Sequence, residues 1–153
     1  MLTNFEIMIE SKKTKVHFFS NDIRANLRNI KKLKLFIESI FKNEGIGLNS
    51  INYIFCSDQY LLKINREYLN HNFYTDIITF DLSESPGRVD ADVFISIDRV
   101  RDNAKKIGVT LKSEIHRVIF HGTLHLCGYR DKTNDDIRVM RVKEDMYLLK
   151  YLG

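Results

Sequence analysis

Two histidines and an aspartate within the stretch HGTLHLCGYRD have the spacing of a metal site. His121 and His125 stand four apart, so on a helix their imidazoles project from one face, a turn apart. Gly128 is suited to a left-handed turn that ends the helix and brings the chain back toward the same ion. Asp131 then takes the third ligand position of the metzincin spacing. The stretch predicts a metal held by His121, His125 and Asp131.

Three protein ligands leave a fourth position open to water, as in catalytic zinc sites. The carboxylate suits Zn²⁺ but also harder cations, so we expect one Zn²⁺ per chain and leave the identity of the metal open. In zincin proteases a glutamate base follows the first histidine, and Gly122 stands there in this chain. A bound metal still lowers the pKa of its water toward about 7. We therefore expect metal-bound water to be the reacting group, favour an anionic phosphodiester over a peptide as substrate, and assign no catalytic side chain.

Other residues of the same helix allow more than one interpretation. Arg117 lies one turn before His121, where it can grip a phosphate beside the metal or pair with Glu114 on a solvated face. His116 points away from the ligand face, and we expect it to be structural. Cys127 is expected to pack in the core rather than to bind the metal.

The elements that must position this motif alternate between strand and helix patterns. The pattern predicts strands at residues 5–10, 16–19, 50–56, 75–82 and 89–97. It predicts helices at residues 22–43, 57–69, 98–107, 110–127 and 134–151. In the last helix we expect one buried face on or near Ile137, Met140, Met146 and Leu149. The fold class is α+β: a small central mixed β-sheet of about four strands flanked by about five helices, with a zincin-like metal-binding helix.

Composition limits the class of protein. The chain has 153 residues, which favours a single domain over 1–153, and 44% are hydrophobic, which argues against disorder. Its two cysteines, Cys56 and Cys127, are too few for a disulfide framework and favour a reducing compartment. The start, MLTNFEIMIE, does not resemble a signal peptide, and no run of 18 apolar residues occurs. We expect a cytoplasmic protein that does not enter the membrane.

The net charge of +4 is only a weak indication of an anionic partner. Basic residues gather in three stretches, at residues 12–15, 24–34 and 99–106. Each can equally be a solvated helix face. Together they permit an anionic partner without requiring one.

The motif also resembles that of a known family. HGTLHLCGYRD is similar to the H-G-x-L-H-L-x-G-Y-D-H signature of the YbeY-type endoribonucleases, the bacterial rRNA maturation factors. Upstream, INREYLNHNFYTDIITFDL resembles the family's N-x-x-Y-R, basic segment and P-T-D-V-L-S-F, and DADVFIS resembles its G-D-I-x-I-S strand. The resemblance covers roughly residues 50 to 150, with matching positions at Asn65, Tyr68, Thr75, Asp76, Phe80 and Asp92.

This resemblance implies a zinc ion on the histidine helix and cleavage of single-stranded RNA. It further implies maturation of the 16S rRNA 3′ end and ribosome quality control, with rRNA and ribosomes or small-subunit precursors as partners. Three positions depart from the pattern: Asp131 replaces a histidine, Leu69 an arginine and Tyr74 a proline. His71, two residues after Leu69, can take over a cationic or proton-transfer role or can simply be exposed to solvent.

The sequence thus predicts a metal-dependent endoribonuclease acting in rRNA maturation. Attack by water and attack by the RNA's own 2′-hydroxyl, with the metal stabilising the phosphorane, both fit. Two alternatives remain open. One is a zincin-like hydrolase of another substrate, which Gly122 disfavours. The other is a non-catalytic ribosome assembly factor with a structural metal, which Leu69 favours and the open ligand position disfavours.

Overall fold

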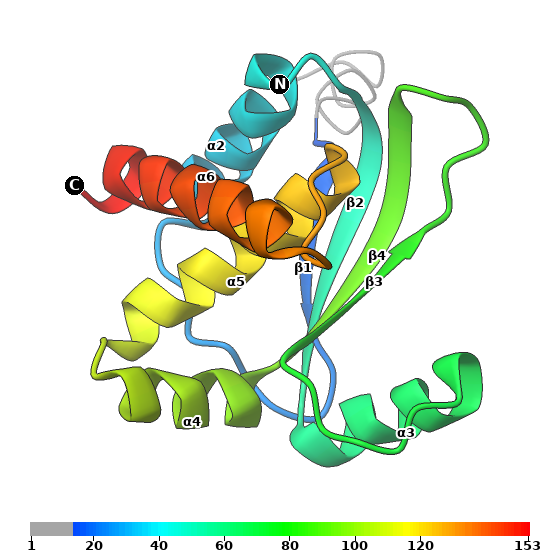
Figure 1. The fold of residues 1–153 in the computed structure, drawn as a ribbon, viewed down its shortest axis with the longest axis vertical. Coiled ribbons are helices and arrows are strands. Elements are labelled where there is room, and N and C mark those ends of the chain that lie inside the picture. The colour runs from blue at the N-terminus through cyan, green and yellow to red at the C-terminus, as the bar shows by residue number, and fades with distance from the viewer. Residues whose placement is uncertain (1–13) are drawn as a thin grey trace, which may run out of the picture.

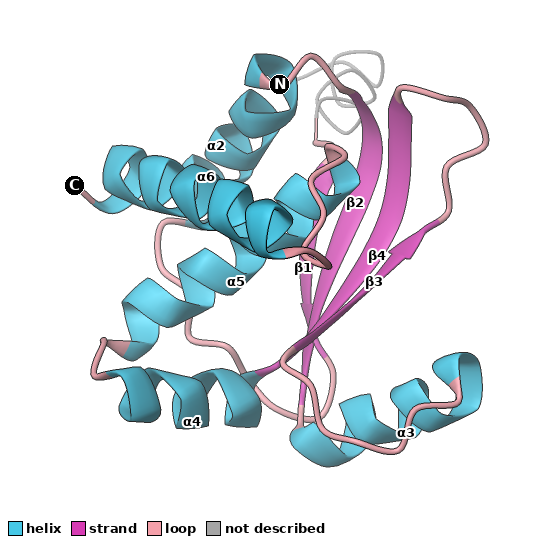
Figure 2. Ribbon diagram, viewed as in Figure 1, coloured by secondary structure: helices cyan, strands magenta, loops and turns pink. Residues whose placement is uncertain are grey.

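The computed structural model describes residues 14–153, so the strand expected at residues 5–10 lies outside the described part. Within that part five helices surround one sheet (Figures 1 and 2). The strands are β1 (Val16–Ser20), β2 (Gly47–Cys56), β3 (Ile77–Asp81) and β4 (Arg88–Ser96). The helices are α2 (Ile30–Asn43), α3 (Asp58–Leu69), α4 (Ile97–Ile107), α5 (Leu111–Leu126) and α6 (Asn134–Leu152). The predicted α+β class is confirmed.

The sheet is mixed and has the strand order β1-β2-β4-β3. β1 with β2 and β2 with β4 are parallel pairs, whose crossovers contain α2 and α3 respectively, and β3 pairs antiparallel with β4. A parallel pair needs such a crossover, whereas β3 and β4 need only the turn that Gly87, at φ 74°, helps to close. β3 is therefore an antiparallel edge beside a parallel core.

Alternation along the strands gives the sheet two different faces. The main core joins one face to α2, α5 and α6, and includes Tyr53, Val93 and Phe120, all of them buried. The opposite face carries a smaller cluster in which Ile78 packs with Leu61 of α3. Figure 1 shows this arrangement, with α2, α5 and α6 gathered on one side of the sheet and α3 apart from them. The predicted metal-binding helix, α5, therefore lies on the main core.

Helix α5 meets the sheet at a glycine. A Cβ added to Gly122 would lie 2.7 Å from Cδ1 of Ile77 on β3 and 3.2 Å from Cγ1 of Val93 on β4. Both distances are shorter than ordinary carbon contacts of about 3.5–4.0 Å. The place where a zincin protease carries its glutamate is therefore filled by the sheet, and the absence of that base follows from how closely the helix packs.

The segment before α2 differs from the prediction. A helix was expected from residue 22, but α2 begins at Ile30, after Asn29 in a left-handed conformation at φ 54°. In residues 22–28 exposed and half-buried positions alternate, as in an extended chain. Ile23 and Leu27, four apart, had suggested a helix, but Ala25 between them also packs on the core. The burial pattern of this segment therefore repeats every two residues, as in an extended chain, and not with the period of a helix.

The buried face of α6 also differs from the expectation. Met140 is buried, but Ile137 and Leu149 are exposed, and the buried positions are Met140, Glu144, Tyr147 and Tyr151. These follow the helical i, i+4, i+7 spacing only when a glutamate is counted among them. The carboxylate lies inside because it has partners there, as the next section describes. None of the helices described over residues 14–153 is long and apolar enough to span a membrane.

The contact at Gly122 predicts a graded loss of stability. In Gly122→Ala, the gain in helix propensity of about 1 kcal/mol opposes an overpacking cost of about 1–3 kcal/mol, so the net change is small. Gly122→Glu also forces a carboxylate against Ile77 and Val93, and we expect it to lower the free energy of unfolding by about 3 kcal/mol or more. Urea denaturation of the two variants measures both changes. Wild-type stability in Gly122→Glu would contradict the close packing.

Candidate metal centre

Helix α5 and the turn after it bring three possible ligands together. The helix begins at an N-cap, Thr110, whose side chain accepts a hydrogen bond from the Ser113 amide, and it is followed by Gly128 at φ 103°. Nε2 of His125 lies 3.0 Å from Nε2 of His121 and 3.2 Å from Oδ2 of Asp131. Nε2 of His121 lies 3.4 Å from the same oxygen. The predicted trio is therefore one cluster that could hold a metal ion.

The other ring nitrogen of each histidine is already occupied. Nδ1 of His121 lies 2.6 Å from Oε2 of Glu144, and Nδ1 of His125 lies 2.9 Å from the carbonyl oxygen of Tyr129. A carbonyl or carboxylate oxygen only accepts, so both Nδ1 atoms carry the proton and donate it. In neutral imidazoles the two Nε2 lone pairs then face each other and the Asp131 carboxylate. Three acceptors directed at one point repel one another, so the arrangement suits a cation between them.

The spacing of these atoms fits a small metal ion. Ligand bonds of about 2.0–2.2 Å at tetrahedral angles place donor atoms roughly 3.3–3.6 Å apart. The three separations here, 3.0, 3.2 and 3.4 Å, lie within this range or up to 0.3 Å below it. The side chains of His121, His125 and Asp131 are 18%, 27% and 45% exposed, so the cluster opens to solvent. The residues present fit a metal ion with an open ligand position.

Glu144 of α6 orients the first histidine and belongs to a buried ionic network. Its second oxygen, Oε1, accepts a bond of 2.9 Å from Arg117, which also donates to both oxygens of Glu114. Burial alone would raise the pKa of Glu144, but hydrogen bonds from His121 and Arg117 outweigh it and the pKa is lowered. For Arg117 the signs are reversed. Burial alone would lower the pKa of its guanidinium, but its hydrogen bonds to Glu114 and Glu144 outweigh burial and the pKa is raised. The carboxylate behind His121 is therefore ionised.

The turn that carries Asp131 is tied to the body of the protein through Glu44. This carboxylate follows α2 and accepts hydrogen bonds from the hydroxyls of Tyr129 at 2.8 Å and Tyr147 at 2.7 Å, and from Lys143 at 3.0 Å. Burial raises its pKa, but these three donors outweigh burial and the pKa is lowered. Tyr129 also accepts the bond from His125 through its backbone. One residue therefore links the second histidine to the turn before the third ligand.

The remaining expectations for α5 have different outcomes. Of the two interpretations of Arg117, the pair with Glu114 is formed, but it is not on a solvated face: Glu114 is 1% exposed. His116 is buried and directs Nδ1 to the carbonyl of Lys112, away from the ligands. Cys127 is half-buried and lies outside the metal cluster. Leu69, which departs from the family pattern, and His71, which could take over the role of the missing arginine, are both exposed.

Sequence reasoning missed Glu144. It follows the second histidine by 19 residues in a different helix, so no local spacing marks it. One signal was available: a glutamate falling between Met140 and Tyr147 at helical spacing interrupts an otherwise apolar face. A charge in that place indicates a buried partner.

Glu144 predicts a change in metal affinity that does not depend on activity. Replacing the partner of a ligating histidine weakens metal binding by about 10- to 100-fold. We expect Glu144→Gln to weaken binding of Zn²⁺ to this extent in competition with a chromogenic chelator. The matched control is Asp145→Asn, an exposed carboxylate on the same helix, which should bind as the wild type does. Equal affinities in the two variants would contradict the orienting role.

Comparison with known proteins places the chain in a family. Residues 8–152 match the family described as Endoribonuclease YbeY. A relative of that name from Cytophaga hutchinsonii is 49% identical over 137 residues, covering 90% of this chain and 96% of the relative. Another from Flavobacterium johnsoniae is 51% identical over 113 residues, covering 74% and 78%.

The fold has a solved counterpart as well. The solution structure of a Thermotoga maritima protein superposes with a TM-score of 0.61 at 25% identity, covering 90% of this chain and 89% of that one. The family match extends over nearly the whole chain and includes the metal cluster. The chain belongs to the Endoribonuclease YbeY family.

Proposed function

We propose that this protein is a metal-dependent endoribonuclease that cleaves single-stranded RNA, with Zn²⁺ held by His121, His125 and Asp131. The observation that carries the proposal is the convergence of two imidazole nitrogens and one carboxylate oxygen within 3.4 Å of one another. Membership of a family whose relatives are named endoribonucleases supports the choice of substrate. The open ligand position supports a catalytic rather than a buried structural ion.

The surroundings of the cluster favour a phosphodiester over a peptide. Hydrolysis by a zincin protease requires a glutamate base next to the first histidine, and Gly122 leaves no room for one. A bound divalent metal would supply Lewis-acid stabilisation of charge on a phosphate and lower the pKa of a water molecule. The chain's own contribution is to hold His121 through Glu144 and His125 through Tyr129, so that both Nε2 atoms stay directed at one point.

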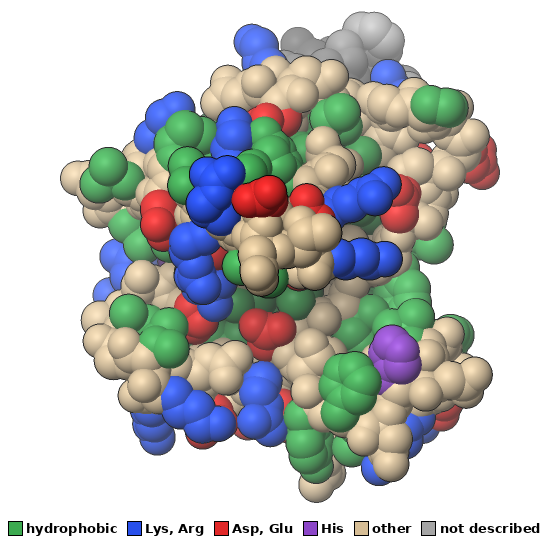
Figure 3. All heavy atoms as spheres, in the orientation of Figure 1, with side chains coloured by type: hydrophobic (Ala, Val, Ile, Leu, Met, Phe, Trp, Pro, Cys, Tyr) green, Lys and Arg blue, Asp and Glu red, His purple; other side chains and the backbone are tan. Residues whose placement is uncertain are grey.

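Exposed aromatic side chains suit contact with single-stranded RNA. Phe73 and Tyr74 are exposed in the loop between α3 and β3, with His71 stacked on Phe73 at 5.1 Å and Arg99 over Tyr74 at 5.0 Å. Figure 3 shows hydrophobic side chains and a histidine grouped on this part of the surface. Unpaired bases stack on such groups. The loop ends at Asp76. Burial raises the pKa of this carboxyl group, and its charge interacts with His121 and Arg117. The loop therefore leads toward the metal cluster.

We extend the proposal to rRNA, in the cytoplasm, with small-subunit precursors or ribosomes as partners. This extension rests on the family resemblance of the HGTLHLCGYRD motif rather than on any contact of the chain. Asp131 in place of the family's histidine leaves the ligand set with a hard oxygen donor, which also accommodates metals other than zinc.

The rival proposal, an assembly factor with a structural metal, is disfavoured by how the turn is held. Glu44 fixes the turn with hydrogen bonds from Tyr129, Tyr147 and Lys143, none of which involves the proposed ligands. Asp131 is 45% exposed at the surface and packs in no core. The fold therefore has its own support and does not require the ion.

Removing the third ligand tests the proposal. We expect Asp131→Ala to reduce cleavage of a fluorescent single-stranded RNA by about 100-fold or more, because the metal is lost or wrongly coordinated. The melting temperature without added metal should stay within a few degrees of the wild type, because the side chain is exposed.

Two controls separate the alternatives. Asp145→Ala removes another exposed carboxylate, one that lies outside the metal cluster, and should leave cleavage unchanged. Chelation of the wild type should abolish cleavage without unfolding it. Unfolding on chelation, or full cleavage by Asp131→Ala, would refute the catalytic ion; cleavage of a peptide substrate but not of RNA would favour the zincin-like hydrolase.

A further inference from the structure

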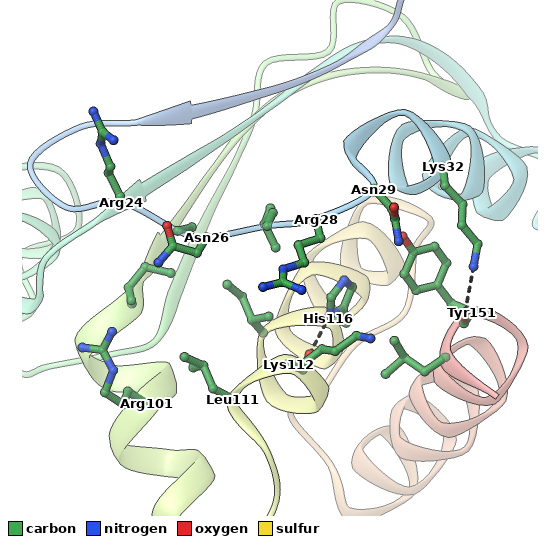
Figure 4. Close-up of a pocket in the computed structure, with 15 residues that line it drawn as sticks. Arg24, Asn26, Arg28, Asn29, Lys32, Arg101, Leu111, Lys112, His116 and Tyr151 are labelled. Carbon is green, nitrogen blue, oxygen red and sulfur yellow. Dashed lines mark hydrogen bonds between the residues drawn. The ribbon is translucent and has the colours of Figure 1, made fainter.

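A second cavity, separate from the metal centre, is lined by basic residues. It lies among the segment before α2, the N-terminal parts of α2 and α5, α4 and the C-terminal end of α6, with a volume of about 520 Å³ (Figure 4). None of the three proposed metal ligands lines it. Pockets of about 300–1,000 Å³ are of the size that holds small organic ligands.

The charged Lys and Arg side chains that line this basic pocket all carry positive charge. Among residues 14–153 no aspartate or glutamate lines it, and no ion pair between them involves any of its five Lys and Arg side chains. Like charges held together favour an anion between them. The five are Arg24, Arg28, Lys32, Arg101 and Lys112.

A buried histidine opens into the same space. His116 is 4% exposed, and its Nδ1 lies 2.6 Å from the carbonyl oxygen of Lys112. Nδ1 therefore carries a proton, and Nε2 has no hydrogen-bonding partner among the described residues. In Figure 4 Arg28 from the segment before α2 and Lys112 from α5 lie on either side of the His116 ring, whereas Arg24 points away. Nδ1 therefore fixes the orientation of the ring, and Nε2 is available to a ligand in the pocket.

The start of α2 adds backbone donors. Its N-cap, Asn29, makes no capping hydrogen bond through its side chain, and the first turn contains no acidic residue. The amides of that turn have no partner inside the helix and attract an anion. Asn29 and Lys32 both line the pocket, so the first turn of α2 borders the same space as the cations.

The remaining lining indicates what the anion is attached to. Leu27, Leu111 and Ile115 form an apolar part of the wall. The amides of Asn26 and Asn29 offer donors and acceptors beside it. An inorganic ion would leave both unused, whereas a nucleoside phosphate has a flat apolar base with polar edges next to its charge.

We propose that the basic pocket binds a nucleotide, with its phosphate between Arg28, Lys112 and His116 and its base against the apolar wall. The ligand can be a free nucleotide or the 5′-phosphorylated end of an RNA strand, which share this chemistry. The proposal does not rest on the catalytic role of the metal centre.

Equilibrium binding to the full chain in the presence of chelator tests this proposal without any cleavage. We expect AMP to bind in the micromolar range and the double variant Arg28→Gln/Lys112→Gln to bind it about tenfold more weakly or worse. The matched control is Lys42→Gln, which removes an exposed lysine at the far end of α2, about 15 Å along the helix from the pocket residue Lys32. It should bind AMP as the wild type does.

Two further probes identify the ligand. Displacement of AMP by a 5′-phosphorylated RNA pentamer, but not by its 5′-hydroxyl form, would assign the pocket to a strand end; no displacement would assign it to a free nucleotide. Absence of binding at millimolar AMP, equal affinity for inorganic phosphate, or equal binding by the double variant would overturn the proposal. Circular dichroism of the double variant, whose two changed residues are exposed, checks that it is folded.

Discussion

The site depends on how closely α5 approaches the sheet. At Gly122 the helix has no side chain between its backbone and the side chains of Ile77 and Val93, which fixes its rotation as well as its distance. With that face against the sheet, His121 and His125 can only project toward α6 and solvent. A protease-type glutamate at residue 122 would have to lie inside the core. Close packing and the absence of a neighbouring base are therefore one property of the fold, and they direct the chemistry toward substrates that need no such base.

Helix α6 holds a charged side chain inside the protein, next to the first histidine. Glu144 is 2% exposed and Glu114 1%, with Arg117 between them. Buried ions are tolerated when they are paired and fully hydrogen-bonded. Arg117 pairs with both carboxylates, and a second guanidinium, that of Arg141, lies 3.5 Å from Glu144, so two positive charges face two negative ones. Because Glu144 accepts the Nδ1 proton of His121, the network fixes this ring with its Nε2 directed toward Asp131.

Local features of the sequence were predicted better than those that join distant segments. The three proposed ligands lie within eleven consecutive residues, so helix geometry and one glycine were enough to predict that they come together. Glu144 was missed because a glutamate in a helix is ordinarily placed outward, and its partner is 23 residues away. The helix predicted over residues 22–28 was wrong, because residues spaced four apart fit both a helical and an extended period. The basic pocket had only weak signs in the sequence, since its residues come from separate elements that no motif connects.

The direction of α5 matters for both of its ends. Aligned peptide dipoles give a helix a partial positive charge at its first turn and a partial negative charge at its last. Leu111 and Lys112, in the first turn, line the pocket that is suited to an anion, whereas His125, in the last turn, belongs to the cluster suited to a cation. A helix running the other way would oppose both. The macrodipole of this one helix therefore favours a phosphate group at its N-terminal end and a metal ion at its C-terminal end.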